Sequence, residues 1–173
     1  PEAPLLPAPV ERWLLRNFPP VLAAVEAAGH LQGPYVSLVD GQDPARGFET
    51  LVYEPRFSTG YFPLRNRPAG LLESHSHKPY RQRVLATRDF LAALVVETGR
   101  AGLALKSAIA EAALAVVQQG QPAAAPSTID VAYARGGSEP YRVPFYDWTI
   151  APSVVSGGDQ IRYRRSVVKE LEV

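Results

Sequence analysis

Cysteine is absent from the 173 residues of this chain. Its absence excludes disulfide bonds, zinc sites built on thiolates and cysteine nucleophiles. Methionine is absent as well, and the chain begins with Pro1. We therefore expect a processed chain or a segment of a longer protein.

The chain also lacks an excess of charge and a long apolar run. Lys and Arg number 18 against 17 Asp and Glu, a net charge of +1. No basic face is implied, so we expect no nucleic-acid partner. The apolar runs are too short to span a bilayer, so we expect no membrane partner, and no signal peptide is visible. Periplasmic, secreted and cytoplasmic locations all stay open.

What is present is an ordinary globular composition, with 46% hydrophobic and 20% charged residues. The length suffices for one domain with a core, with or without a small appendage. Residues 1–9 contain four prolines and predict an extended lead-in. Residues 10–17 and 21–28 have helical composition. Because the proline pair Pro19-Pro20 between them is costly inside a helix, we predict two helices or one sharply kinked helix.

The middle of the chain mixes strand and helix signals. Short strands are predicted over 35–39 and 48–53, followed by a long loop over 54–68. The clearest helical pattern covers 79–97, with Pro79 suited to its first turn. Gly99 is expected to end it, and a second helix is expected over 101–118.

The last third has a different character. Residues 120–128 read as a linker by composition. Residues 129–173 predict a small antiparallel β unit, with Gly-rich turns between its strands. Its strands are expected over 129–134, 141–150 and 160–167.

One stretch concentrates the chemistry-bearing side chains, from Gly70 to His77. If it is extended, alternate side chains share a face, so Glu73, His75 and His77 would lie along one side. A carboxylate at a strand end, bounded by a helix, is where α/β folds place their chemistry. The alternative is a partly buried carboxylate paired with Arg81 or Arg83.

Three neighbouring segments resemble the C-terminal part of bacterial zinc carboxypeptidases of the M14 family. They are Phe57-Ser58-Thr59-Gly60-Tyr61, the run from Leu64 to His75 (LRNRPAGLLESH), and the run from Lys78 to Val84 (KPYRQRV). The resemblance covers roughly residues 10–96. It implies a mixed, mostly parallel sheet with helices on both faces, in which the last core strand supplies a catalytic glutamate. Glu73 stands where that glutamate would be.

The resemblance also implies zinc held by two histidines and a glutamate, with Glu73 moving a proton from the zinc-bound water to the leaving amine. In the family two of the ligands come as His-x-x-Glu. That spacing is absent here, because His30, His75 and His77 are each followed three residues later by another residue type. We therefore expect zinc in the full-length protein only, and neither zinc nor hydrolysis in this chain alone.

Other candidate residues flank the stretch. The resemblance implies a tyrosine that closes over the substrate, for which Tyr53 and Tyr61 are the candidates, and packing under the loop is the alternative. Arg65 could bind a substrate carboxylate, as could Arg56 and Arg67, or all three could be solvated loop charges. His75 and His77 with Glu73 form a possible metal set, with hydrogen-bonded structural histidines as the competing reading.

These observations give two hypotheses. The first is the C-terminal region of a zinc metallocarboxypeptidase-like hydrolase acting on a peptide or amide bond near a free carboxyl terminus. Residues 10–119 would then form the later part of its α/β core. The second is a non-enzymatic α/β interaction or structural module. Because a cut sheet exposes edges and apolar faces, we also expect this chain to form a homo-oligomer.

Overall fold

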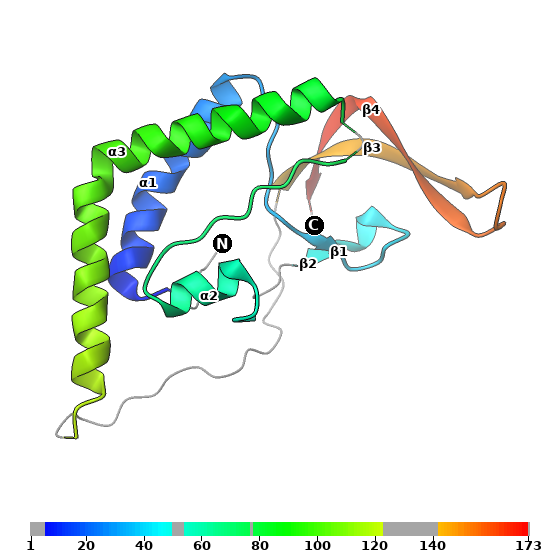
Figure 1. The fold of residues 1–173 in the computed structure, drawn as a ribbon. Coiled ribbons are helices and arrows are strands. Elements are labelled where there is room, and N and C mark those ends of the chain that lie inside the picture. Colours follow the sequence, from blue (N-terminus) through cyan, green and yellow to red (C-terminus); the bar gives the residue numbers. More distant parts are fainter. Residues whose placement is uncertain (1–5, 50–53, 77, 123–141, 173) are drawn as a thin grey trace. The chain divides into compact units, whose positions relative to one another are not determined.

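A computed structural model describes residues 6–49, 54–76, 78–122 and 142–172. In these ranges the elements are three α-helices, one short 3-10 helix and two antiparallel two-stranded sheets (Figure 1). The chain divides into two compact units, one of residues 1–30 with 52–133 and the other of residues 31–51 with 134–173.

The expected mixed, mostly parallel sheet with flanking helices is therefore wrong. Both sheets are antiparallel, and each pairs only two strands that are close in the chain. The stretch 70–76, expected to be a core strand, forms neither strand nor helix. A strand needs hydrogen-bonded neighbours to be stable, and the described residues supply none for this stretch.

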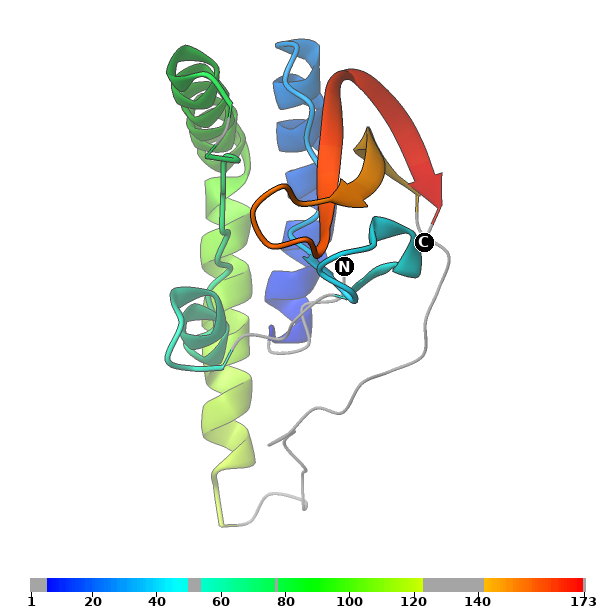
Figure 2. The same ribbon diagram turned by 90° about the vertical axis from the view of Figure 1, so that its right-hand side faces the viewer.

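The first unit is built on helices α1 (Ala8–Ala27) and α3 (Tyr80–Gln119), which lie side by side (Figure 2). They run antiparallel, because Val10 near the start of α1 packs with Ala112 near the end of α3, whereas Val25 packs with Phe90. Short helix α2 (Ser58–Leu64) precedes the irregular stretch that leads into α3.

Two apolar clusters join α1 to α3. One is centred on Val10 and Ala112, with Leu6, Leu14, Leu105, Ala108 and Ile109 around them. The other is centred on Val21, Val25 and Phe90, with Phe18, Leu22, Ala93 and Leu94 around them. Burial of these apolar side chains is the main favourable term for a helix pair of this kind.

Helix α1 continues through Pro19 and Pro20, where the sequence predicted a break or a sharp kink. Proline removes the N–H that would bond to the carbonyl four residues earlier, here those of Leu15 and Arg16. Both residues are exposed, so water can hydrogen-bond their carbonyls. Burial of Val21 and Val25 just beyond the prolines holds the second half of the helix in place.

Helix α3 also continues where a break was predicted, through Gly99 and Gly102. It bends near its middle, and the part beyond the bend runs straight (Figure 1). Glycine in a helix interior costs only about 1 kcal/mol relative to alanine. Packing against α1 on both sides of the bend offsets that cost.

By length and composition alone, α3 could cross a bilayer, since an 18-residue window of it has a mean hydropathy of 1.4. Core helices of soluble proteins pass the same test, and this feature by itself decides nothing about a membrane. The expectation of no membrane partner considered only uninterrupted apolar runs. Helix α3 reaches this mean hydropathy although charged residues interrupt its apolar sequence.

The second unit contains both sheets. Strands β1 (Ser37–Leu38) and β2 (Phe48–Glu49) flank the 3-10 helix η1 (Pro44–Arg46). Strands β3 (Arg142–Pro152) and β4 (Asp159–Glu172) form a long hairpin with an irregularity in register between Tyr146 and Asp147. The hairpin confirms the antiparallel pairing expected for the last two strands. The strand predicted over 129–134 lies outside the described residues.

Aromatic rings gather on the hairpin. The ring of Phe145 lies 5.4 Å from that of Phe48 and 5.8 Å from those of Trp148 and Tyr163, measured between centroids. At the hairpin turn Gly157 adopts a positive φ of 71°, a conformation that residues with a Cβ rarely adopt. Partial burial among the aromatic rings raises the pKa of the Tyr163 hydroxyl.

Candidate functional site

Glu73 lies in the irregular stretch between α2 and α3, and its side chain is exposed. The preceding Leu71 and Leu72 are exposed too. The turn that leads into α3 contains a backbone hydrogen bond of 3.0 Å from the amide of Lys78 to the carbonyl of His75. The stretch thus presents a carboxylate to solvent.

The carboxylate of Glu73 has no hydrogen bond or ion pair within the described part of the chain. The expected alternative partners, Arg81 and Arg83, form no ion pair with it. The guanidinium of Arg83 instead lies 5.8 Å from the centre of the Tyr80 ring, and among the residues that the structure describes its buried Nε has no hydrogen-bond partner. Both oxygens of Glu73 are therefore available as proton or hydrogen-bond acceptors.

The other expected site residues are not joined to Glu73 by any hydrogen bond or ion pair among the described residues. Tyr61 lies on α2, half exposed, with its ring edge-on to Phe62 at 5.6 Å. Arg65 follows α2 and is exposed. Tyr53 and His77 lie outside the described residues. For the ranges that the structure covers, no three His, Asp or Glu side chains come together as a metal-binding group.

The remaining arginines of the loop have local partners. Arg56 forms an ion pair of 2.9 Å with Glu54, and its guanidinium lies over the Phe57 ring. The Nη1 of Arg67 donates to the carbonyl oxygen of Arg65 at 3.0 Å. These contacts favour the interpretation of Arg56 and Arg67 as loop charges over the alternative that they are arranged to bind a substrate carboxylate.

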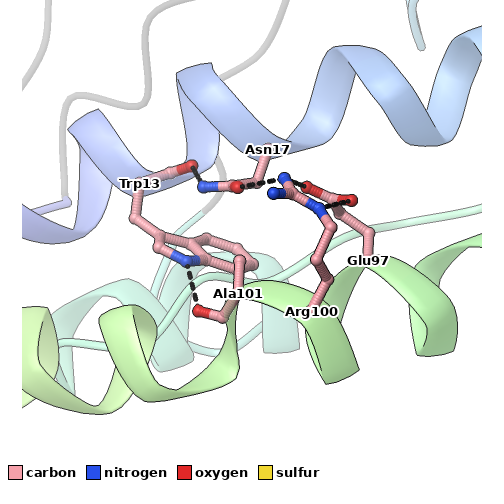
Figure 3. Close-up of polar contacts among 5 residues, drawn as sticks. All are labelled: Trp13, Asn17, Glu97, Arg100 and Ala101. Carbon is pink, nitrogen blue, oxygen red and sulfur yellow. Dashed lines mark hydrogen bonds and ion pairs between the residues drawn. The ribbon is translucent and has the colours of Figure 1, made fainter.

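A partly buried polar cluster, the Trp13–Arg100 cluster, joins α1 and α3 (Figure 3). Along α1 its residues fall between the buried residues of the two apolar clusters. The indole N–H of Trp13 donates to the carbonyl oxygen of Ala101 at 3.0 Å, and the amide of Asn17 donates to the carbonyl oxygen of Trp13 at 2.7 Å. Arg100 donates from Nη2 to Asn17 at 3.2 Å and from Nε to Glu97 at 2.9 Å. A second hydrogen bond joins Arg100 and Glu97.

This cluster satisfies groups that would be costly if left alone. The side chain of Glu97 is only 9% exposed and that of Asn17 is buried. The hydrogen bonds from Arg100 lower the pKa of the Glu97 carboxyl and raise that of the Arg100 guanidinium. Both groups are consequently charged at neutral pH. The pair lies within α3, and the hydrogen bond from Arg100 to Asn17 connects it to α1.

A second polar contact ties the chain that follows α1 to α3. The Nε2 of His30 lies 2.8 Å from Oδ2 of Asp89, and the Nε of Arg88 donates to the other oxygen at 2.7 Å. An ionised carboxylate only accepts, so Nε2 of His30 is the donor. The hydrogen bond from His30, and then that from Arg88, lower the pKa of Asp89.

Asp89 and Glu97 both line a shallow open groove of about 380 Å³ between α1 and α3. Its other walls are small or apolar, from Pro20, Val21, Ala24, Ala28, Ala92, Ala93 and Val96. Both carboxylates already have cationic partners, so the groove offers apolar contact and little acid–base capacity.

Sequence reasoning missed both polar clusters. A signal for the Glu97–Arg100 pair did exist, because opposite charges three residues apart share one face of a helix. The pairing of His30 with Asp89 joins residues 59 positions apart and left no local signal.

In comparisons with known proteins, no family model, no curated protein and no solved structure matches the chain.

Proposed function

We propose that this chain is the C-terminal region of a zinc carboxypeptidase-like hydrolase and contributes Glu73 as the general base. One observation carries the proposal: Glu73 is exposed, and nothing in the described part of the chain pairs with it. It sits inside the stretch whose residues resemble the catalytic glutamate segment of that family.

In this role the Glu73 carboxylate accepts a proton from the attacking water and then delivers it to the leaving nitrogen. The substrate is a peptide or amide with a free terminal carboxylate. Tyr61 on α2 and Arg65 just after it are the described candidates for contacting that substrate. Both residues are exposed, and each side chain has a group that can hydrogen-bond a ligand.

The described residues do not fit a zinc site, since they bring no three suitable side chains together. Zinc ligands would have to come from another part of the protein. The role of this chain is the proton transfer by Glu73.

The test uses a longer polypeptide that contains this segment and a His-x-x-Glu sequence. We expect Glu73→Gln to reduce turnover of an N-blocked dipeptide by at least about a hundredfold, because the general base is lost. Zinc content should stay unchanged. Glu54→Gln is the matched control, since Glu54 is an exposed loop glutamate paired with Arg56. Turnover that survives in the Glu73→Gln protein would refute the assignment.

A second candidate is a non-enzymatic interaction module. It is favoured by the large apolar side chains that α3 exposes, among them Val95, Val96, Leu103 and Leu114. Exposed apolar patches of this kind mark sites of protein association. If the longest natural product of the gene has no His-x-x-Glu sequence and no hydrolytic activity, this candidate replaces the first.

A further inference from the structure

The straight C-terminal part of α3 carries an exposed, mostly apolar stripe, the outer stripe. Its members are Leu103, Ser107, Ala110, Leu114 and Val117, spaced alternately four and three residues apart. Leu103 is 86% exposed, Leu114 63% and Val117 59%. Alternate spacing of four and three is the seam of a coiled coil.

The outer stripe lies away from α1. The residues of the same helical part that touch α1 are Leu105, Ala108, Ile109 and Ala112. At 100° per residue, these four positions are centred roughly opposite the outer stripe. This part of α3 is therefore apolar on two faces, and α1 covers only one.

The charges beside the stripe indicate what covers the other face. Lys106 and Glu111 lie on opposite sides of the stripe and are both exposed. They are five residues apart, one directly before the stripe position Ser107 and the other directly after Ala110. In a parallel two-stranded coiled coil, these are the two positions that meet across the seam between one helix and its partner.

We propose that this part of α3 pairs with α3 of a second copy as a parallel two-stranded coiled coil. Leu103, Ala110 and Val117 then pack against their own equivalents. Lys106 of each copy meets Glu111 of the other, which gives two ion pairs. In an antiparallel pair the same side of each helix would meet itself, bringing Lys106 towards Lys106 or Glu111 towards Glu111.

Little in the single chain opposes this pairing. Glu111 contacts Arg12 at 3.9 Å, but both side chains are about two-thirds exposed, so the contact contributes little. Lys106 has no ion-pair partner among the described residues.

The interface is small. About sixteen residues at 1.5 Å each span about 25 Å, and the seam contains Ser107 and Ala110 besides its larger members. A seam of this length with such small side chains buries an area near the lower limit for a specific interface. We therefore expect a reversible dimer that forms at micromolar or higher protein concentration. This inference does not depend on the proposed hydrolase function.

Charge reversal tests the orientation. In sedimentation equilibrium of the 173-residue chain, Lys106→Glu or Glu111→Lys alone should weaken dimerisation roughly tenfold, because two attractive pairs become repulsive. The double variant Lys106→Glu with Glu111→Lys should restore it. Arg81→Glu, an exposed charge reversal at the start of α3, is the control and should change nothing. Circular dichroism checks that each variant keeps its helices.

Cysteine crosslinking gives an independent readout, because the natural chain has no cysteine. Leu103→Cys and Val117→Cys should each form a disulfide-linked dimer rapidly under mild oxidation, since like positions meet in the parallel pair. Val154→Cys, at a hairpin residue that is 94% exposed, measures random collision. In an antiparallel pair, Leu103→Cys would link to Val117→Cys in a mixture of the two.

Several outcomes would overturn the proposal. They are a wild-type chain that stays monomeric at several hundred micromolar, single charge reversals that leave the dimer unchanged, and crosslinking no faster than for Val154→Cys. A fourth is pelleting of the monomer with phosphatidylcholine vesicles that is abolished by Leu114→Lys, which would assign the outer stripe to a membrane surface instead.

Discussion

Removal of two methyl groups at Val10 tests whether the α1–α3 pair is held by its apolar clusters. Val10 is fully buried against Ala112. Valine to alanine loses roughly 1.6 kcal/mol of transfer free energy, at about 0.8 kcal/mol for each carbon. The cavity left behind adds to this, so we expect Val10→Ala to lower the free energy of unfolding by about 2 kcal/mol.

The measurement is urea unfolding followed by circular dichroism at 222 nm, which reports chiefly on α1 and α3. In thermal unfolding followed by the same signal, a loss of 2 kcal/mol should lower the melting temperature by roughly 10 °C in a unit of about one hundred residues. Val95→Ala is the matched control: the same change on α3 at a side chain that is 71% exposed, with an expected effect under about 0.5 kcal/mol.

Val21→Ala, in the other cluster, should cost about as much as Val10→Ala. The two sites are eleven residues apart on α1, about 16 Å, so their effects should add in the double variant. Equal stability of the Val10→Ala and Val95→Ala proteins would refute the assignment of the core.

Three further predictions concern α1 and α3. Lowering the pH should destabilise the helix pair, because the pKa values of Asp89 and Glu97 are lower in the folded state than in the unfolded state. The stabilisation from these carboxylates is fully present above their unfolded-state pKa values, and it is lost as the pH falls through their folded-state pKa values. Thermal melts between pH 7 and pH 2 should show this loss, and a flat profile would contradict it. Trp13→Phe should cost about 1 kcal/mol in urea unfolding, because the hydrogen bond to Ala101 is lost; no change would mean that the bond is not formed in solution. Gly99→Ala should stabilise by about 0.5–1 kcal/mol, because an added Cβ meets nothing within 4 Å and alanine favours the helix; destabilisation would point to a break at residue 99.

The sequence predicted the positions of α1 and α3 well and their continuity poorly. It missed α2, which lies within the predicted loop 54–68. Residues 79–97 were predicted as a helix that begins near Pro79, and α3 begins at Tyr80. At Pro19-Pro20 the alternative of two separate helices is wrong, and α3 is likewise continuous through Gly99, although it bends near its middle (Figure 1). Contacts between α1 and α3 outweigh the local cost of these residues. That stabilisation comes from residues more than sixty positions apart and has no local signature.

In the β structure, the prediction that depended on a local turn was correct, and the one that depended on distant neighbours was wrong. The hairpin of β3 and β4 was predictable because its partners are joined by a Gly-rich turn. The strand expected at Glu73 depended on neighbours that the resemblance implied, and no described residue supplies them. The sequence singled out Glu73 as a candidate residue, but its surroundings could be learned only from the structure.

The Trp13–Arg100 cluster has a consequence for how α1 is aligned on α3. If α1 moved along α3 by one helical turn, Arg100 and Glu97 would face the aliphatic side chains of a neighbouring cluster, and the indole N–H of Trp13 would lose its acceptor. Two smooth apolar surfaces would tolerate several such offsets, whereas a charged group in the middle permits one. The cluster therefore specifies a single alignment of α1 along α3.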